Sequence, residues 1–282
     1  MRKAPIPVPD ITLNNGVTIP QLGFGVFKVP APDTRDVVLE AIDVGYRHID
    51  TAQMYGNEVG VGSAVRDSGL PRSDLFVTSK LNNGFHDPDD AMAAFARTLA
   101  DLDIGYVDLF LIHWPLPAVG DFVDTWRAME AMLATGDVRA IGVSNFHQAH
   151  LERVLAEGTI VPAVNQIEVH PYLVQESLRR FCFDNDIAVE AWSPIARGRV
   201  LSDPVVIGIA ERIARTPSQV VLRWHVQRGD IVFPKTVHRE RMIENFEIFD
   251  FDLTDEDMAA LTALGRDERT GPDPDEFNWI PD

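Results

Sequence analysis

The sequence predicts an α/β fold, a closed (β/α)8 barrel of the TIM type with an N-terminal β-hairpin and a C-terminal tail loop. Two observations support this prediction. From residue 22 onward, short apolar stretches rich in β-branched residues alternate with longer amphipathic ones, and there are eight of the short stretches. An eightfold alternation of strands and helices over about 250 residues is typical of this barrel. The 282 residues, of which 45% are hydrophobic and 24% are charged, are then expected to form one domain over residues 1–282.

The elements outside the barrel are short. Residues 1–10 form a proline-rich lead that we expect to be extended. Residues 11–20 contain two alternating runs on either side of Asn15-Gly16, a dipeptide that tolerates the positive φ angles of a tight primed turn, so they predict a hairpin. At the other end, residues 265–282 are expected to form the tail.

The predicted strands are short and apolar. They cover residues 22–24, 46–50, 75–80, 107–113, 139–144, 164–168, 188–191 and 231–233. The predicted helices lie between or after the strands, where apolar residues recur at spacings of three and four. They cover residues 34–44, 58–68, 89–102, 122–134, 148–157, 177–184, 218–228 and 255–264. Before the last of them, Thr254 precedes three acidic residues, which suit a helix N-terminus.

A doubly wound dinucleotide-binding fold is the competing architecture, because it also alternates strands and helices. Its fingerprint is a glycine-rich turn that opens the first helix after the first strand. The stretch 23–28 lacks the third glycine at the required spacing, and Gly60 and Gly62 lie within a helical stretch instead of after a strand. The barrel is therefore the favoured prediction.

Charge and composition exclude several classes of function. The chain has 43 acidic and 25 basic residues, a net charge of −18, which disfavours binding to nucleic acid or to an anionic membrane surface. A polyanionic ligand would need a local basic pocket. Cys182 is the single cysteine, no apolar run approaches the roughly 20 residues of a spanning helix, and the N-terminus has no apolar core of a secretion signal. We therefore expect a cytoplasmic protein without a membrane partner.

Polar residues end several of the apolar strands. Asp50, Lys80 and His113 end the second, third and fourth predicted strands. Because function on this fold resides where the carboxyl ends of the strands meet, these three side chains should converge. Tyr55 lies on the loop that follows Asp50 and can lean over the same mouth.

An acid, an amine, an imidazole and a phenol together favour proton chemistry. The pKa of tyrosine is ordinarily about 10, and a neighbouring ammonium lowers it by stabilising the phenolate. We expect Lys80 to provide that charge, Asp50 to hold the ammonium, and His113 to be a neutral donor to a carbonyl oxygen. Taken singly, each residue also has a structural explanation, such as a solvated strand end or an ion pair. No pair of histidines has zinc-ligand spacing with an obvious third ligand, so no metal site is expected.

The residues around this constellation resemble the aldo-keto reductase family. The first signature is Gly45-Tyr46-Arg47-His48-Ile49-Asp50-Thr51-Ala52-Gln53-Met54-Tyr55-Gly56-Asn57-Glu58. Residues 111–115, 141–146, 165–168 and 233–236 resemble later family motifs, in order, and residues 245–251 and 269–275 resemble the bacterial branch that includes the 2,5-diketo-D-gluconate reductases. The resemblance implies reduction of an aldehyde or ketone, with Asp50, Tyr55, Lys80 and His113 as the catalytic residues and Tyr55 as the general acid.

The resemblance also implies NADPH as the cofactor. Ser144, Asn145 and Gln166 would hold the carboxamide, and Trp192, next to Ser193, would stack on the nicotinamide. The segment after the eighth strand would bind the rest of the cofactor, with Lys235, Thr236 and Arg241 around the 2′-phosphate, Val237 and His238 beside them, and Glu244 and Asn245 at the adenine. His238 stands where close relatives often have arginine. This segment would be the cationic pocket that so acidic a chain requires.

For the substrate, the resemblance implies only a chemical class, small carbonyl compounds. The protein is expected to be a monomer. Phe27, Trp114 and Asn82 would line its pocket, and Asn82 stands where many relatives have an aromatic residue, so the pocket should be wider or more polar. Two other functions stay open on this scaffold: a slow nucleotide-sensing binding protein, and a metal-dependent barrel hydrolase.

Overall fold

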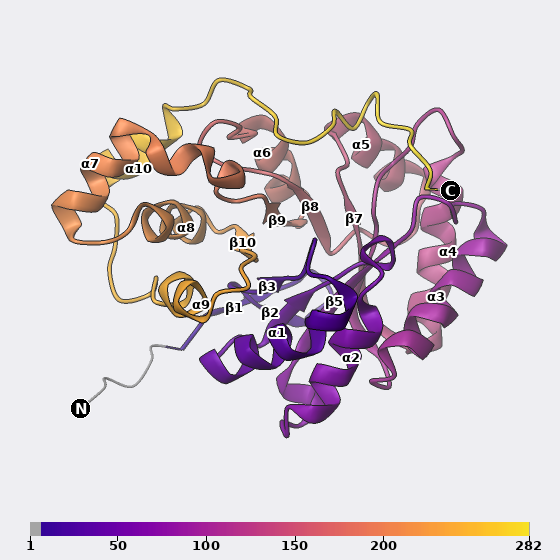
Figure 1. Ribbon diagram of the computed structural model, residues 1–282. Coiled ribbons are helices and arrows are strands. Elements are labelled where there is room, and N and C mark those ends of the chain that lie inside the picture. The colour runs from indigo at the N-terminus through magenta and orange to yellow at the C-terminus, as the bar shows by residue number, and fades with distance from the viewer. Residues whose placement is uncertain (1–6, 282) are drawn as a thin grey trace.

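A computed structural model describes residues 7–281 and has eight parallel strands that close into a barrel (Figure 1). The strands are β3 (Phe24–Gly25), β4 (His48–Asp50), β5 (Phe76–Leu81), β6 (Val107–Ile112), β7 (Val138–Ser144), β8 (Val164–Glu168), β9 (Ala188–Trp192) and β10 (Ile231–Val232). Each strand pairs with the next one along the chain. A parallel bridge between Leu22 and Val232 closes the ring, and the Gly23 amide donates to the Val232 carbonyl at 2.7 Å. The predicted barrel is confirmed.

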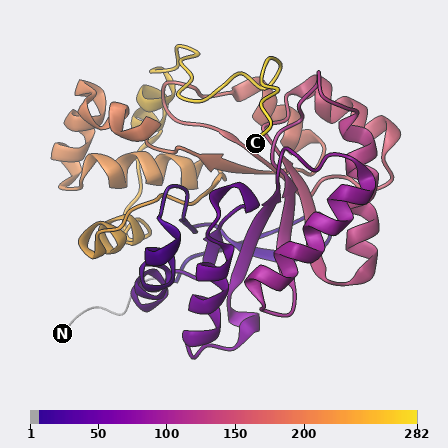
Figure 2. The same ribbon diagram turned by 45° about the vertical axis from the view of Figure 1, so that its right-hand side comes forward.

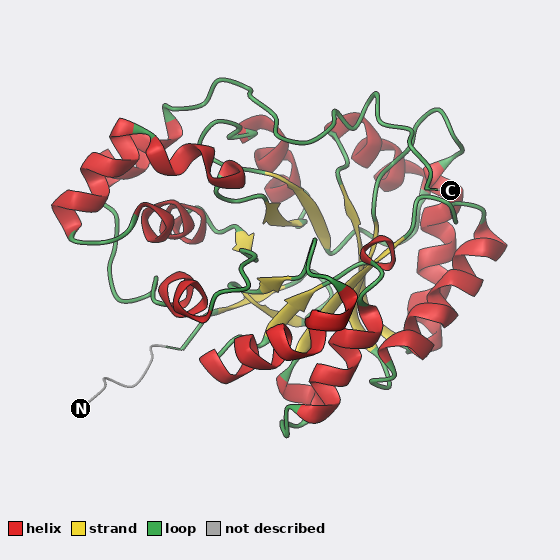
Figure 3. Cartoon of the chain, viewed as in Figure 1, coloured by secondary structure: helices red, strands yellow, loops and turns green. Residues whose placement is uncertain are grey.

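Helices surround the strands (Figure 3). They are α1 (Ala31–Val44), α2 (Glu58–Asp67), α3 (Pro88–Leu102), α4 (Phe122–Thr135), α5 (Gln148–Glu157), α6 (Glu176–Asp184), α7 (Pro204–Ile213), α8 (Pro217–Gln227), α9 (Arg239–Phe246) and α10 (Asp255–Thr262). Local capping fixes several of their starts; Thr216 and Gln219, for example, form a reciprocal capping box on α8. No helix in the described part of the chain is long and apolar enough to cross a bilayer.

Two helices differ from the sequence prediction. The prediction omitted α7, which is an additional helix between β9 and α8 that starts at the Asp203 cap. It also omitted α9, a helix of eight residues in which the buried Met242 and Phe246 lie among mostly polar and charged residues. The helix after β10 is therefore α9, and α10, which was predicted, is an extra element after the barrel.

The hairpin closes the amino-terminal end of the barrel. It consists of β1 (Asp10–Thr12) and β2 (Thr18–Pro20), while the first six residues of the expected extended lead lie outside the described residues. Its loop has three residues, with the Gly16 amide donating to the Leu13 carbonyl at 2.9 Å and Gly16 at φ +84°, so the expected two-residue primed turn is wrong. Leu13 and Ile19 pack against side chains of the barrel core.

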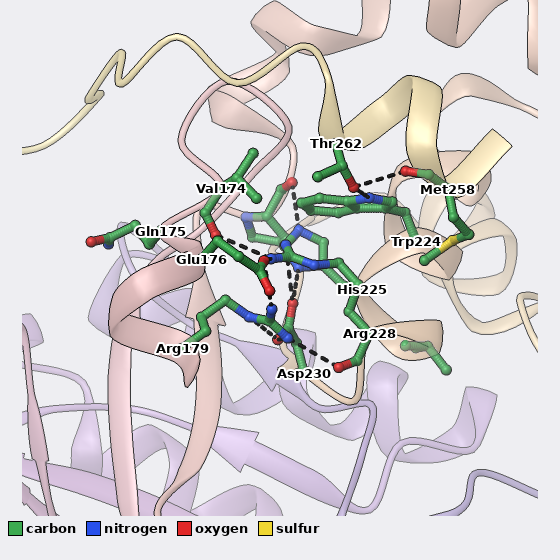
Figure 4. Close-up of polar contacts among 12 residues, drawn as sticks. Val174, Gln175, Glu176, Arg179, Trp224, His225, Arg228, Asp230, Met258 and Thr262 are labelled. Carbon is green, nitrogen blue, oxygen red and sulfur yellow. Dashed lines mark hydrogen bonds and ion pairs between the residues drawn. The ribbon is translucent and has the colours of Figure 1, made fainter. Parts of the chain in front are cut away.

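A buried ionic network joins α6, α8 and the residue before β10 (Figure 4). The His225 imidazole lies 3.0 Å from the Asp230 carboxylate, and Arg179 Nε donates to the same carboxylate at 2.8 Å. Burial raises the pKa of Asp230, but the hydrogen bonds and charges of these partners outweigh it and hold the pKa below its ordinary value. Trp224 Nε1 donates to Thr262 at 3.1 Å and ties α10 to the same region. This network joins the outer helices to one another and to the start of β10.

The tail crosses the molecule after α10 and ends beside the α3 and α4 side (Figures 1 and 2). The Asn278 side chain accepts from the Ala118 amide at 2.7 Å, and Asn83 Nδ2 donates to the Trp279 carbonyl at 2.9 Å. The tail therefore contacts the loops that follow β5 and β6, at the carboxyl end of the barrel.

Candidate active site

The four predicted catalytic residues lie together at the carboxyl end of the barrel. Asp50 ends β4, Lys80 lies near the end of β5, His113 follows β6, and Tyr55 ends a 3₁₀ turn after β4. Lys80 Nζ donates to both carboxylate oxygens of Asp50 at 2.8 Å and lies 3.4 Å from the Tyr55 hydroxyl. The rings of Tyr55 and His113 are 5.8 Å apart in an edge-to-face arrangement. The convergence expected from the strand ends is confirmed.

Lys80 is completely buried and held as an ammonium ion. Besides Asp50, its Nζ donates to the Thr51 carbonyl at 2.8 Å. Burial alone would lower the pKa of Lys80, but the charges of Asp50 and Tyr55 and the bond to Asp50 raise it above its ordinary value. A fixed positive charge therefore lies directly beside the Tyr55 hydroxyl.

Lys80 lowers the pKa of Tyr55, as expected, but burial outweighs this effect and the net pKa is raised. Burial raises the pKa of Tyr55, and this effect exceeds the opposite effect of the Lys80 ammonium, while Asp50 raises it further. The reason is that the partly exposed phenol has lost most of the water that would solvate a phenolate. Tyr55 therefore keeps its proton at neutral pH and is available as a proton donor.

His113 is neutral, as expected. Burial and then the charge of Lys80 lower its pKa well below the ordinary value, because a second positive charge is unfavourable there. Its backbone carbonyl accepts from Asn145 Nδ2 at 2.9 Å, which fixes the start of the loop after β6. The imidazole can then donate one N–H to an oxygen in the mouth.

The residues predicted to hold the carboxamide lie at the end of β7 and in the middle of β8, and those predicted at the nicotinamide ring lie at the end of β9. Ser144 Oγ donates to the Gln166 carbonyl at 2.8 Å. Asn145, at φ +64°, accepts the indole N–H of Trp192 on its Oδ1 at 2.8 Å, and Ser193 has φ +49°. Non-glycine residues in this left-handed region cost about 1–3 kcal/mol and concentrate at functional sites. The bond from Trp192 to Asn145 was not anticipated from the sequence.

Gln166 forms hydrogen bonds through its side-chain amide inside the barrel. Its Nε2 donates to Asp50 Oδ2 at 2.8 Å and to Glu190 Oε2 at 2.7 Å. Sequence reasoning did not select Glu190, although a charged residue in the middle of an apolar strand was a signal for it. Glu190 is completely buried.

The tail is fixed over the mouth by the buried carboxylate of Glu168. Glu168 accepts from the Thr270 amide at 2.6 Å and from the Gly271 amide at 3.1 Å. A Cβ atom on Gly271 would lie 2.4 Å from the ring of Trp192, so only glycine lets the tail pass this close to the indole.

The predicted substrate residues have unequal environments. Phe27 is 50% exposed and packs on Tyr55 at a ring distance of 5.0 Å, so it borders the mouth. Trp114 is 8% exposed and packs on Phe277 of the tail at 4.3 Å. Asn82 Oδ1 accepts from the Gly84 amide at 3.1 Å, which turns this oxygen toward its own loop. Phe277 of the tail, which the sequence did not single out, thus packs on Trp114.

The predicted cofactor segment, residues 235–245, begins after β10 and continues almost to the end of α9. Lys235 and Arg241 are exposed and form no ion pair with any described residue, whereas the neighbouring Arg239 pairs with Asp43 at 2.6 Å. His238 is the cap residue of α9, its amide donating to Thr236 Oγ1 at 3.1 Å, and Val237 is exposed. Two exposed cations beside a helix N-terminus suit a phosphate.

A pocket of about 500 Å³ lies next to this segment, between α8 and α9. Glu244, one of the residues predicted at the adenine, lines it and accepts from Thr216 Oγ1 at 2.7 Å. Asn245 is buried beside it and accepts from Ser218 Oγ at 2.8 Å. Three glutamates, Glu240, Glu244 and Glu247, line this pocket and neither Lys235 nor Arg241 does, so a phosphate would be held by the exposed cations outside it.

One group of possible metal ligands lies near the tail. His147, Asp273 and Asp275 offer atoms within 4.8 Å of one another. Arg269 donates to His147 Nε2 at 2.9 Å, which places the imidazole proton on Nδ1, 2.8 Å from Asp275 Oδ1. The group is satisfied as a hydrogen-bonded ion cluster that holds the tail, and we assign no metal to it.

Comparison with known proteins gives one consistent result. The model of the aldo/keto reductase family matches residues 21–266. The chain is 46% identical to a glyoxal reductase of Bacillus subtilis, with 95% of this chain and 96% of that protein covered. It is 44% identical to the methylglyoxal reductase DkgA of Yersinia pestis, with 95% and 97% covered. A solved structure of a Gox0644 mutant in complex with NADPH superimposes with a TM-score of 0.94 at 42% identity, covering 97% of this chain and all of that one.

Proposed function

This chain belongs to the aldo/keto reductase family, and we propose that it reduces small aldehydes and ketones to alcohols with NADPH, using Tyr55 as the general acid. The observation that carries the proposal is the contact of a buried ammonium, Lys80 Nζ, with both Asp50 and the Tyr55 hydroxyl beside a neutral His113. Relatives named for glyoxal and methylglyoxal reduction make short dicarbonyl compounds the first substrates to test.

The residues that would hold NADPH are those that the strand ends and the basic segment present. The nicotinamide would be held by Ser144, Asn145, Gln166, Trp192 and Ser193. The 2′-phosphate and adenine would be held by Lys235, Thr236, Val237, His238, Arg241, Glu244 and Asn245. When bound, the cofactor supplies a hydride to the carbonyl carbon.

The chain's own residues manage the proton and the developing charge. His113 donates an N–H to the carbonyl oxygen and orients it toward Tyr55. The Tyr55 hydroxyl gives its proton to that oxygen as it gains negative charge, and the phenolate that remains lies 3.4 Å from Lys80 Nζ. Attraction between unit charges at about this distance is on the order of 4 kcal/mol in a partly solvated site. Asp50 keeps the ammonium in place throughout.

The proposal is tested by following NADPH absorbance with a panel of aldehydes, ketones and dicarbonyl compounds. We expect turnover with some of them, and Tyr55→Phe should lower kcat by roughly 10²-fold to 10⁴-fold while NADPH affinity changes little. Turnover that persists in Tyr55→Phe would show that another group is the acid. Tight NADPH binding with no turnover of any carbonyl compound would favour a nucleotide-sensing protein instead.

A further inference from the structure

A buried carboxyl group that the proposed mechanism does not use lies beneath the catalytic residues. Glu190 is in the middle of β9 with no exposed surface, and its direct neighbour across the sheet is Gln166 on β8. Glu190 Oε2 accepts from Gln166 Nε2 at 2.7 Å, while Oε1 has no hydrogen-bond partner among residues 7–281 and lies 3.9 Å from His48 Nε2. Its single strong contact is therefore with Gln166.

The Gln166 amide is fixed from two sides. A primary amide has two N–H donors and one carbonyl acceptor. One donor goes to Glu190 and the other to Asp50 Oδ2, at 2.8 Å. Because β4 and β8 are not neighbours in the sheet, the contact with Asp50 crosses the barrel interior. The carbonyl oxygen is then the one polar atom of this side chain left for a ligand, and it can accept a carboxamide N–H.

We propose that Glu190 is a positioning residue, which holds the Gln166 amide in the orientation that presents its carbonyl oxygen to the nicotinamide carboxamide. The inference rests on the proposed function, because it assigns Gln166 to that cofactor. Without Glu190, one N–H of Gln166 would lose its partner, and the amide could rotate about its terminal bond and present a donor where an acceptor is needed.

The charges around Glu190 are consistent with a neutral acceptor. Burial, and then the Asp50 carboxylate, raise the pKa of Glu190 to about 8, so it is protonated at neutral pH. The groups that face it are Asp50 and His48 on β4, Lys80 on β5 and Gln166 on β8. Burial lowers the pKa of His48 to about 3, so that imidazole is neutral. A neutral Glu190 does not compete with Asp50 for the Lys80 ammonium.

The test compares two variants and two ligands on the full-length protein. Glu190→Gln keeps an acceptor and is neutral, whereas Glu190→Leu removes the acceptor. The ligands are NADP⁺ and 2′,5′-ADP, which contains the adenine and 2′-phosphate but no nicotinamide. We expect Glu190→Leu to lower the affinity for NADP⁺ about 10-fold, which corresponds to about 1.4 kcal/mol of binding free energy. Its affinity for 2′,5′-ADP should change less than about twofold. Glu190→Gln should bind both ligands within about twofold of wild type at pH 7.

Three outcomes would overturn the proposal. An unchanged ratio of NADP⁺ to 2′,5′-ADP affinity in Glu190→Leu would show that Glu190 does not act on the nicotinamide end. A Glu190→Gln variant as weak as Glu190→Leu would show that an acceptor at this position is not what matters. A wild-type protein that binds neither ligand would overturn the proposed function and this inference with it. Thermal melting of each variant identifies any loss of affinity that is due to unfolding.

Discussion

Lys80→Met should destabilise the fold strongly, because it leaves a buried carboxylate without its counter-ion. Lys80 is fully buried and Asp50 is 2% exposed, and the substitution removes both bonds of 2.8 Å between them. Breaking a buried ion pair by removing one partner costs roughly 3–5 kcal/mol. Asp50 then keeps the hydrogen bond from Gln166 Nε2, at 2.8 Å. One hydrogen bond does not compensate for burying an unpaired carboxylate.

The assay is a double-mutant cycle by urea denaturation, followed by circular dichroism. Asp50→Asn alone should also cost several kcal/mol, but Asp50→Asn with Lys80→Met should cost less than the sum by about 2 kcal/mol or more, because the double variant buries no net charge. The loss in Lys80→Met should shrink at acidic pH, where Asp50 takes up a proton.

An exposed ion pair provides the control. Arg127 and Asp124 are 2.6 Å apart, with side chains 52% and 55% exposed, so Arg127→Met should cost about 0.5 kcal/mol or less. If Lys80→Met costs no more than this control, or if the two buried substitutions are additive, the ammonium is not held by Asp50 as described.

Three further predictions concern pH, cofactor charge and the tail. Because the folded-state pKa of Glu190 is raised from 4.5 to about 8, its contribution to stability is full below pH 4.5 and is lost as pH rises to about 8. The melting temperature of Glu190→Gln should therefore rise relative to wild type over this range, and a constant difference would refute the assignment. Replacing Lys235 and Arg241 with glutamine should lower the affinity for NADPH about 10-fold to 100-fold and leave the affinity for NADH nearly unchanged. The affinity of the variant for NADPH should also depend less on salt concentration than that of wild type. A wild-type affinity for NADPH that does not vary with ionic strength would contradict this prediction. Gly271→Ala places a Cβ atom 2.4 Å from the Trp192 indole and should raise the KM for NADPH. Gly120→Ala is the control and should leave this KM unchanged, because its Cβ atom would have no other described atom within 4 Å.

The barrel and the convergence of the four proposed catalytic residues could be predicted from the sequence because both depend on local patterns. Period-two apolar stretches identify strands, and parallel strands place their carboxyl ends at one edge. Asp50, Lys80 and His113 are each the polar end of such a stretch, so their convergence follows from the fold class. Helix α9 was missed because it is only eight residues long and most of them are polar or charged, although Met242 and Phe246 have helical spacing.

Quantities that depend on burial or on contacts distant in the chain were decided by the tertiary structure. The direction of the Tyr55 pKa shift follows from how much water the assembled mouth excludes, which residue spacing does not determine. Glu190 meets Gln166 only because the register of β8 and β9 places them side by side. Gly271 reaches Trp192 through a tail that joins the site from the far end of the chain. The sequence by itself determined which chemical groups stand at the strand ends, and folding decided their protonation, their orientation and what covers them.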